Sequence, residues 1–291
     1  MKISVSHVLA FAVCVALAAP AWAVTPNLAM GNPSDATADA ANRSNFLMDR
    51  QYFALSYNDG KGIPNWVAWR LVPEDIGHAP RVKFHPDMDL PEDYKHVETS
   101  DYTSQGFDRG HMCDHGDRSS TLEASTATFA MTNIVPQSAE LNRKAWAHLE
   151  AYCRELVGQG KTLYIYSGPL GQGGSGSEGD ATVIGEKHQI AVPAKCWKVI
   201  MVLDRAGRDP EADIAQVTTA TRMIAVVMPN DRSVGEPWAG FRTSVAEVEK
   251  LTGFTFYKNV PAAVMGPLKK QVDSQFVPVP VPFRDWNSIS H

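Results

Sequence analysis

The fold is decided by residues 141–157, which read LNRKAWAHLEAYCRELV. Apolar residues recur every three or four positions along this stretch and Gly158 follows it, which predicts a helix ending at residue 157. Eight residues separate Asn142 from Glu150, so the two lie roughly 80° apart around a helix. Glu150 and Arg154 are i and i+4 neighbours on one face. One side of this helix can therefore present an amide oxygen, a carboxylate and a guanidinium group.

The segments around this helix predict one mixed α+β domain, with a central, largely antiparallel sheet flanked by helices. Alternation over residues 51–57 and 66–72, with a turn signal at 58–60, predicts a hairpin that carries Arg70 on its second strand. The glycine-rich stretch 168–179 precedes strands and not a helix, which favours a flexible hairpin loop over a dinucleotide-binding loop. Further strands are expected at 128–134, 162–167, 181–184, 189–192, 198–203 and 223–228, and a short helix at 244–251.

Residues 1–23 predict a secretory signal peptide. Lys2 precedes an apolar run from Val8 to Ala19, and residues 21–23, AWA, have the small-x-small form of a cleavage site. The run is too short to span a bilayer, so we expect no membrane anchor and an exported protein, periplasmic or secreted, whose mature chain begins near Val24. Residues 24–45 read as a flexible N-terminal lead-in, 46–275 as the folded domain, and 276–291 as an extended C-terminal tail in which Val and Pro alternate.

Composition sets two further limits. The 291-residue chain has a formal net charge of −5, and loss of residues 1–23, which contain Lys2 and no acidic residue, makes it −6. An acidic chain is not typical of a nucleic-acid binder, so a positive site would have to come from a few arginines and a metal. Export permits a disulfide among Cys113, Cys153 and Cys196, but the sequence does not select the pair.

A second cluster supplies the complementary chemistry. Residues 108–112 read DRGHM, and residues 132–137 read TNIVPQ. A histidine such as His111 can accept a proton from water near neutral pH. Amide and carboxylate oxygens suit Mg²⁺, and a guanidinium suits a phosphate. Together these groups are typical of a phosphodiester hydrolase, although spacing alone also allows Asn142 to be a helix cap and Glu150–Arg154 to be a solvated ion pair.

The segment 108–111 resembles the DRGH signature of the DNA/RNA non-specific endonuclease family. These are the ββα-metal, or His-Me finger, nucleases, which include mitochondrial endonuclease G and secreted bacterial nucleases. The blocks at 132–137 and 141–154 resemble the family's next blocks, in order and spacing. The strand with Arg70, and Lys198 after Trp197, are also similar. The resemblance extends from about Gln51 to about Val272, which makes residues 46–275 the expected nuclease domain.

The resemblance implies a Mg²⁺-dependent, sugar-non-specific endonuclease, with Mn²⁺ as an alternative metal. His111 would be the general base that deprotonates the attacking water. Asn142 would be the direct protein ligand of the metal, and Glu150 would hold a metal-bound water. The metal would assist the leaving 3′-oxygen, which gives 5′-phosphate ends on DNA and RNA.

The remaining roles that the resemblance implies concern phosphate and the histidine-bearing loop. Arg70 and Arg154 would bind phosphate and stabilise the transition state, and Asn133 would position the histidine or the substrate. Because such contacts fall on phosphates, cleavage should be largely independent of base sequence. Three residues are expected to shape the substrate loop: Asp108, Arg109 and Gly110.

One segment departs from the family pattern. The family often has Pro or Ala-Pro after the His-Met pair, whereas residues 113–116 here read CDHG. His111, Cys113 and His115 alternate, so on a strand they could share one side and bind zinc, although no second cluster completes four ligands. We expect instead that His115 is a loop histidine and Asp114 a solvated acid.

Two other functions remain open on the sequence. One is a non-catalytic protein that uses the same fold to bind nucleic acid or a partner, which the acidic charge favours. The other is hydrolysis of a different phosphodiester. The sequence also leaves open a homodimer, an inhibitor protein and the preference between DNA and RNA.

Overall fold

The computed structural model of the protein describes residues 25–235 and 237–277. The predicted signal peptide lies outside the described residues, and so does the predicted tail from residue 278 onward. In the described part of the chain, no helix combines the length and the apolar character needed to cross a membrane.

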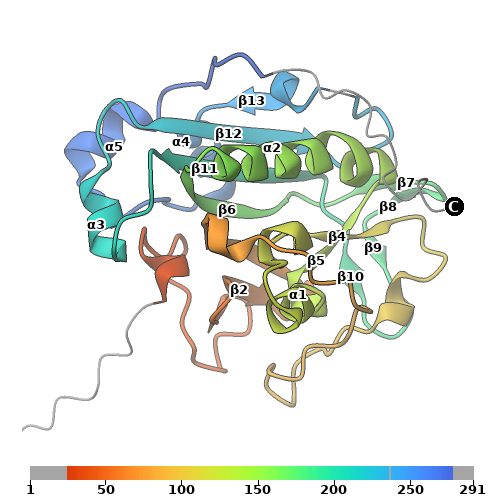
Figure 1. Ribbon diagram of the computed structural model, residues 1–291. Helices are drawn as coiled ribbons and strands as arrows, with labels where there is room; N and C mark the ends of the chain where they lie inside the picture. Colours follow the sequence, from red (N-terminus) through yellow and green to blue (C-terminus); the bar gives the residue numbers. More distant parts are fainter. Residues whose placement is uncertain (1–24, 236, 278–291) are drawn as a thin grey trace, which may run out of the picture.

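A seven-stranded sheet forms the centre of the molecule (Figure 1). Its strand order is β1-β2-β3-β6-β11-β12-β13, and every neighbouring pair is antiparallel, which confirms the expected mixed α+β class. The strands are β1 (Phe46–Asp49), β2 (Ala54–Asn58), β3 (Ile63–Leu71), β6 (Thr162–Leu170), β11 (Lys195–Leu203), β12 (Arg222–Pro229) and β13 (Arg242–Thr243).

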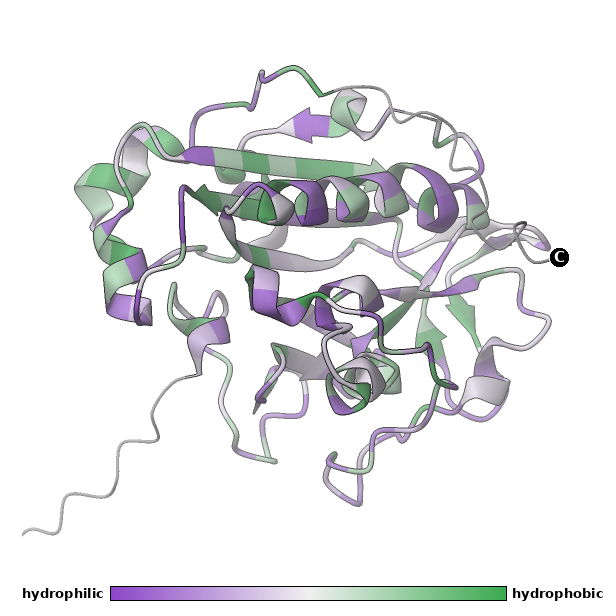
Figure 2. Cartoon of the chain, viewed as in Figure 1, coloured by the Kyte–Doolittle hydropathy of each residue, from purple (hydrophilic) through white to green (hydrophobic). Residues whose placement is uncertain are grey.

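The central strands are buried on both faces because each face is covered by its own apolar core. On β3, Trp69 contributes to one core and Trp66 to the other, since successive side chains of a strand point to opposite sides. Figure 2 shows hydrophobic residues along β11 and β12, whereas the outward face of α2 (Ala147–Gly158) carries hydrophilic ones. Burial on both sides explains why these strands read as nearly continuous apolar runs.

The helices cover the two faces separately. Helix α2 lies across the front of the sheet in Figure 1, with Leu149 and Cys153 in the first core. Helices α4 (Val245–Thr252) and α5 (Ala262–Leu268) contribute to the second core. The other elements are η1 (Pro26–Leu28), η2 (Pro73–Asp75), η3 (Thr99–Tyr102), η4 (His115–Arg118), α1 (Leu122–Thr128), η5 (Met131–Asn133), β7 (Gly174–Gly176), β8 (Gly179–Ala181), β9 (Val183–Ile184), β10 (Ile190–Ala191), α3 (Pro210–Ala215) and η7 (Trp238–Phe241).

A small strand pair and a helix position the candidate site. Strand β4 (Asp108–His111) pairs antiparallel with β5 (Ile134–Gln137). The chain then enters η6 (Leu141–Trp146), a π-helix that continues directly into α2. The helix predicted over 141–157 is therefore present, but its first part holds a wider turn than the α-helix that the spacing argument assumed.

Two expectations need correction. The predicted strand at 128–134 is wrong: Thr128 is the last residue of α1, residues 131–133 form η5, and the strand begins only at Ile134. Thr121 caps α1 by accepting a hydrogen bond from the Ala124 backbone N–H at 3.1 Å. The predicted flexible lead-in is also wrong for residues 25–45. Its apolar side chains fill the second core, and its backbone forms a parallel bridge with β1; the buried residues include Leu28, Ala29, Met30 and Ala36.

The glycine-rich stretch forms a hairpin, as expected. Strands β7 and β8 pair antiparallel, with Gly176 opposite Gly179 at the tip. Gly179 has φ 111°, a conformation that favours glycine. No helix follows the glycines before residue 210, so this loop lacks the architecture of a dinucleotide site.

Candidate active site

His111 is the last residue of β4, and its backbone is held from two sides. It pairs with Ile134 of β5. The Trp146 indole N–H donates a hydrogen bond to the His111 carbonyl oxygen at 3.2 Å. Because Trp146 ends the π-helix that also carries Asn142, this bond ties the strand of the histidine to that helix. The two segments that carry His111 and Asn142 therefore lie together.

The imidazole of His111 lies in an aromatic enclosure. Its centroid is 5.3 Å from the Phe84 ring and 4.9 Å from the nearly perpendicular Phe129 ring. The residue is 7% exposed, and Nε2 is buried without a hydrogen-bond partner among the described residues. Burial lowers the pKa of His111 to about 4; the negative charge of Asp114 opposes this shift and the positive charge of Arg81 adds to it. The ring is therefore neutral at neutral pH, with a nitrogen able to accept a proton.

Asn142 is oriented by its amide nitrogen. Nδ2 donates to Oδ2 of Asp108 at 2.9 Å, and the same carboxylate accepts two bonds from Arg143, at 2.8 and 2.6 Å. A carboxylate can only accept, so the nitrogen of the amide must face it. The amide oxygen is left as the end that can bind a ligand. Asn142 does not cap the helix, since it lies inside η6, whose N-cap is Glu140.

Glu150 belongs to α2 and lies on the side of the helix that faces the sheet. It is buried, and its Oε1 is 3.4 Å from Nζ of Lys198 on β11. Burial raises the pKa of Glu150 to about 8; repulsion from Asp114 adds to the rise, while Lys198 and Arg154 oppose it. A cation bound nearby would favour the ionised carboxylate. Glu150 and Arg154 therefore do not form the solvated surface pair that their spacing also allowed.

Arg154 forms ion pairs with two carboxylates. Its Nη1 pairs with Asp114, and with Asp117 at 3.0 Å. The expectation that Asp114 is a solvated acid is wrong: its side chain is 14% exposed, and it also caps η4 by accepting from Gly116 at 3.1 Å. Arg154 lowers the pKa of Asp114 against the opposing effect of burial. Since Asp114 also acts electrostatically on His111, the histidine and the residues of α2 surround one carboxylate.

Asn133 holds the backbone that follows the histidine. Its Oδ1 accepts from the Cys113 N–H at 2.9 Å, and its Nδ2 donates to the carbonyl oxygens of Cys113 and Thr128, both at 2.9 Å. Its own carbonyl accepts from the Met112 N–H at 2.9 Å. The side chain is fully buried, so Asn133 supports the position of His111 through residues 112–113.

Arg109 and Gly110 shape β4 in different ways. Arg109 donates from Nη2 to the Thr99 carbonyl oxygen at 2.5 Å, with its guanidinium 5.7 Å from the Tyr102 ring. At Gly110 a Cβ would come within 2.0 Å of Oε1 of Gln137. Only glycine allows the Gln137 side chain to lie across the strand.

Arg70 is not brought to this cluster. Its Nε pairs with Asp213 of α3 at 2.7 Å, and Tyr164 donates to the same carboxylate at 2.8 Å. On β3, Trp69 faces the core under α2, so Arg70, its neighbour along the strand, points to the opposite face. The guanidinium expected to bind phosphate therefore serves a structural ion pair.

The residue that sequence reasoning missed is Arg81. Its guanidinium lies 5.1 Å from the centroid of the Phe129 ring, which itself packs on His111, and its charge lowers the pKa of His111. Arg81 comes from an irregular proline-rich loop without periodicity. The one local signal is a basic residue shortly before an aromatic one, Phe84, whose ring also packs on His111.

The donor set fits a hard divalent cation that takes few protein ligands. Asn142 and Glu150 offer oxygen atoms, and a hydrated Mg²⁺ needs only one or two such ligands. Within residues 25–235 and 237–277, no group of three or more His, Cys, Asp or Glu side chains is placed to hold a metal ion. The zinc alternative at His111, Cys113 and His115 therefore has no ligand cluster to support it. Cys113 is a buried free thiol, as are the other two cysteines of the described chain, and burial raises its pKa.

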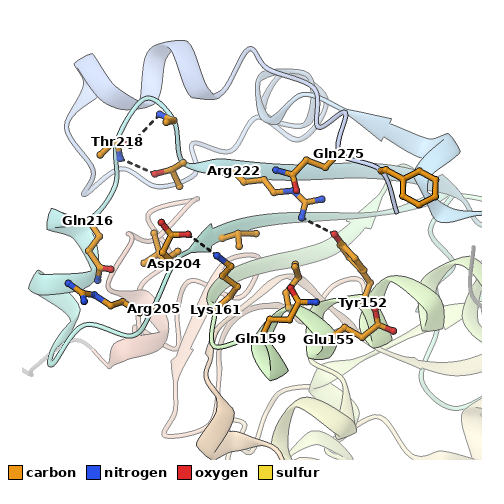
Figure 3. A pocket seen from close by; sticks show the side chains of 16 residues that line it. Tyr152, Glu155, Gln159, Lys161, Asp204, Arg205, Gln216, Thr218, Arg222 and Gln275 are labelled. Carbon is orange, nitrogen blue, oxygen red and sulfur yellow. Dashed lines mark hydrogen bonds and ion pairs between the residues drawn. The ribbon is translucent and has the colours of Figure 1, made fainter. Parts of the chain in front are cut away.

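A large hollow lies elsewhere. A pocket of about 880 Å³ is formed at the far end of α2 and is drawn in Figure 3. Within it, Lys161 pairs with Asp204 at 2.8 Å, and Arg222 donates to the Tyr152 hydroxyl at 2.8 Å. Neither His111 nor Asn142 lines it. The chemistry points to the β4–η6 contact instead, because there the unpartnered nitrogen of His111 lies on the strand that is bonded to the helix of Asn142.

Comparisons with known proteins place the chain in a nuclease family. The family model of the DNA/RNA non-specific endonucleases matches residues 31–263. A nuclease of Nostoc sp. is 42% identical over 252 residues, covering 86% of this chain and 87% of the relative. Bovine mitochondrial endonuclease G is 30% identical over 226 residues, covering 74% and 70%.

A solved structure shows the same fold. The crystal structure of an EndoG/EndoGI complex, described for its mechanism of EndoG inhibition, superposes with a TM-score of 0.63 at 25% identity. The match covers 81% of this chain and 91% of that one. The family model and the relatives named as nucleases thus agree with the fold, and the chain belongs to the DNA/RNA non-specific endonuclease family.

Proposed function

We propose that the protein is a Mg²⁺-dependent endonuclease that hydrolyses DNA and RNA without base specificity and leaves 5′-phosphate ends. The observation that carries the proposal is the state of His111. A buried, neutral imidazole with an unpartnered nitrogen lies on a strand that is tied, through Asp108 and Trp146, to the helix presenting the Asn142 amide oxygen. A base held beside a cation ligand is what water attack on a phosphodiester requires.

In this proposal His111 takes the proton from the attacking water. The amide oxygen of Asn142 would hold the metal directly, and Glu150 would hold it through water; Mn²⁺ is the alternative ion. When bound, the cation would neutralise charge that develops on the phosphate and the leaving 3′-oxygen. Arg81 replaces Arg70 as the expected phosphate contact, since its guanidinium lies on the Phe129 ring that packs on the histidine, and its charge acts on the imidazole.

Arg154 and Asn133 have supporting roles. Arg154 would stabilise negative charge at the phosphate through the donors not used on Asp114 and Asp117. Asn133 would keep the backbone after His111 in place. Contacts of this kind fall on the sugar–phosphate backbone and carry no base information.

The test is metal-dependent degradation of supercoiled plasmid and of RNA by the mature protein. We expect both to be cleaved with Mg²⁺ and neither with excess chelator. General-base removal typically costs 10²- to 10⁴-fold in rate, so His111→Ala should lose activity by about that factor while keeping its fold. Plasmid cleavage by His111→Ala at the wild-type rate would overturn the mechanism. End-labelling before and after phosphatase treatment would identify the 5′-phosphate.

We further propose export to the periplasm or the medium, with cleavage after Ala23. Residues 28–30 are buried in the second core, so cleavage at this point would leave this buried segment in the mature chain. The N-terminal residue of protein purified from the periplasmic fraction and from the medium, read by mass spectrometry, should be Val24. An intact Met1 terminus in both fractions would contradict this processing.

A further inference from the structure

Lys198 is an unusual residue for its position. It lies in the middle of β11, and its side chain is 1% exposed. Lysine is almost never fully buried without a partner, because removing an ammonium group from water is costly. A lysine on a central strand therefore needs an explanation that packing alone does not provide.

The surroundings of Lys198 connect it to both sides of the active site. Its Nζ is 4.3 Å from the centroid of Trp146 and 5.5 Å from that of Trp69. The Trp146 indole N–H bonds the His111 carbonyl oxygen, and the Trp69 indole N–H bonds Asp117 at 3.0 Å. The ammonium is thus stabilised by two aromatic faces whose polar edges hold the strand and the loop of the site.

The ion pair with Glu150 is the polar contact of Lys198. Nζ lies 3.4 Å from Oε1 of Glu150. The nearest other cation on the helix, Arg154, is paired with Asp114 and Asp117. Among the described residues Glu150 has no other ion pair within 4.0 Å, so Lys198 is what anchors its carboxylate to the sheet.

We propose that Lys198 is a positioning residue of the active site, which fixes the carboxylate of Glu150 so that Glu150 can hold the water shell of the metal. This inference rests on the proposed function, because it assigns Glu150 a place beside the bound cation. Lys198 is buried under α2 and cannot reach the substrate. Its loss should therefore change metal binding and kcat, and leave KM for nucleic acid unchanged.

The experiment measures Mg²⁺ binding to the metal-free mature protein by calorimetry, together with kcat and KM on plasmid DNA. The variants are Lys198→Met, Glu150→Gln and the double variant, with Lys161→Met as the matched control. Lys161 also pairs with a carboxylate, Asp204, but at the remote pocket of Figure 3. Residues around a metal that orient its ligands typically affect affinity or activity 10- to 100-fold.

We expect Lys198→Met to raise the Mg²⁺ dissociation constant and lower kcat by about 10- to 100-fold, with KM unchanged. Glu150→Gln should have a similar effect, and the double variant should be little worse than either single one. The double variant also guards against misfolding, since it removes both buried charges and should unfold at a higher temperature than Lys198→Met. Lys161→Met should bind Mg²⁺ as wild type does.

Two results would overturn the inference. One is a Lys198→Met protein that is less stable but binds Mg²⁺ with wild-type affinity; the other is a double variant whose losses are the product of the two single losses. Both can occur while His111→Ala is inactive, in which case the proposed function stands and only the role of Lys198 falls. An active His111→Ala would instead contradict the proposed function itself.

Discussion

Replacing Asp108 should show how far the site depends on the orientation of one amide. The Asp108 carboxylate accepts one bond from Asn142 and two from Arg143. The Arg143 side chain is 69% exposed, so its ion pair contributes about 0–1 kcal/mol. The Asn142 bond is better shielded, because the Asp108 side chain is 19% exposed, and a hydrogen bond to a charged group contributes about 1.5–3 kcal/mol.

The expected loss follows from these values. If the whole contribution of the Asn142 bond serves to orient the amide oxygen, Asp108→Ala should lower kcat roughly 10- to 100-fold, since about 1.4 kcal/mol corresponds to tenfold. Asp108→Asn should lose less, because its amide oxygen can still accept from Asn142. Arg143→Met removes the exposed pair and leaves the Asn142 bond, so its kcat should stay within about fivefold of wild type.

The assay is the initial rate of supercoiled plasmid relaxation at saturating Mg²⁺ and saturating DNA, with circular dichroism to confirm folding. The order of kcat should be wild type, Asp108→Asn, Asp108→Ala. An Asp108→Ala enzyme within threefold of wild type would show that the amide needs no anchor. Equal losses in Asp108→Ala and Arg143→Met would show that the ion pair, and not the amide, is what matters.

Three further changes test other parts of the structure. The pKa of His111 in the folded protein, about 4, lies below its ordinary value of 6.5. Because the unfolded chain then binds the proton more tightly, wild type should lose about 3 kcal/mol of unfolding free energy relative to His111→Gln as pH falls from 6.5 to 4. Parallel curves of unfolding free energy against pH for the two proteins would refute this. Arg70→Leu leaves Asp213 buried without its cation and should lower the free energy of unfolding by about 3–5 kcal/mol, while kcat per folded molecule stays near wild type. A large loss of kcat without a loss of stability would show that Arg70 acts in the site. Asn133→Ala removes three buried bonds around Cys113 and should cost about 3 kcal/mol or more and lower kcat, whereas unchanged chemical denaturation would show that these bonds carry no stability.

Much of the sheet could be predicted because its central strands are buried on both faces. The apolar runs expected at 162–167, 198–203 and 223–228 correspond to β6, β11 and β12. The helix from residue 141 was also predictable, since its apolar spacing is regular. The prediction for 128–134 failed because α1 ends at Thr128 and η5 covers residues 131–133, and local strand propensity is easily overridden by the tertiary context.

The candidate site was predictable where its residues fall on the motif. Its electrostatics were not predictable, because they depend on which face of a strand each side chain points to and on how irregular loops fold. Residue 70 points away from the site since strand side chains alternate, and the sequence does not say which face α2 covers. Phe84 packs on His111 and the charge of Arg81 acts on it, both from an irregular loop, and no pattern of spacing predicts where such a loop folds.

The π-helical turn makes the protein sensitive to a single-residue length change that would leave its composition almost untouched. A residue lost from 143–145 would let the turn relax to α-helical geometry. Everything from residue 147 onward could keep its place against the sheet, while the preceding residues would rotate by about 100°. A natural relative one residue shorter at this point would retain the architecture but would present the counterpart of Asn142, our proposed metal ligand, from a different position.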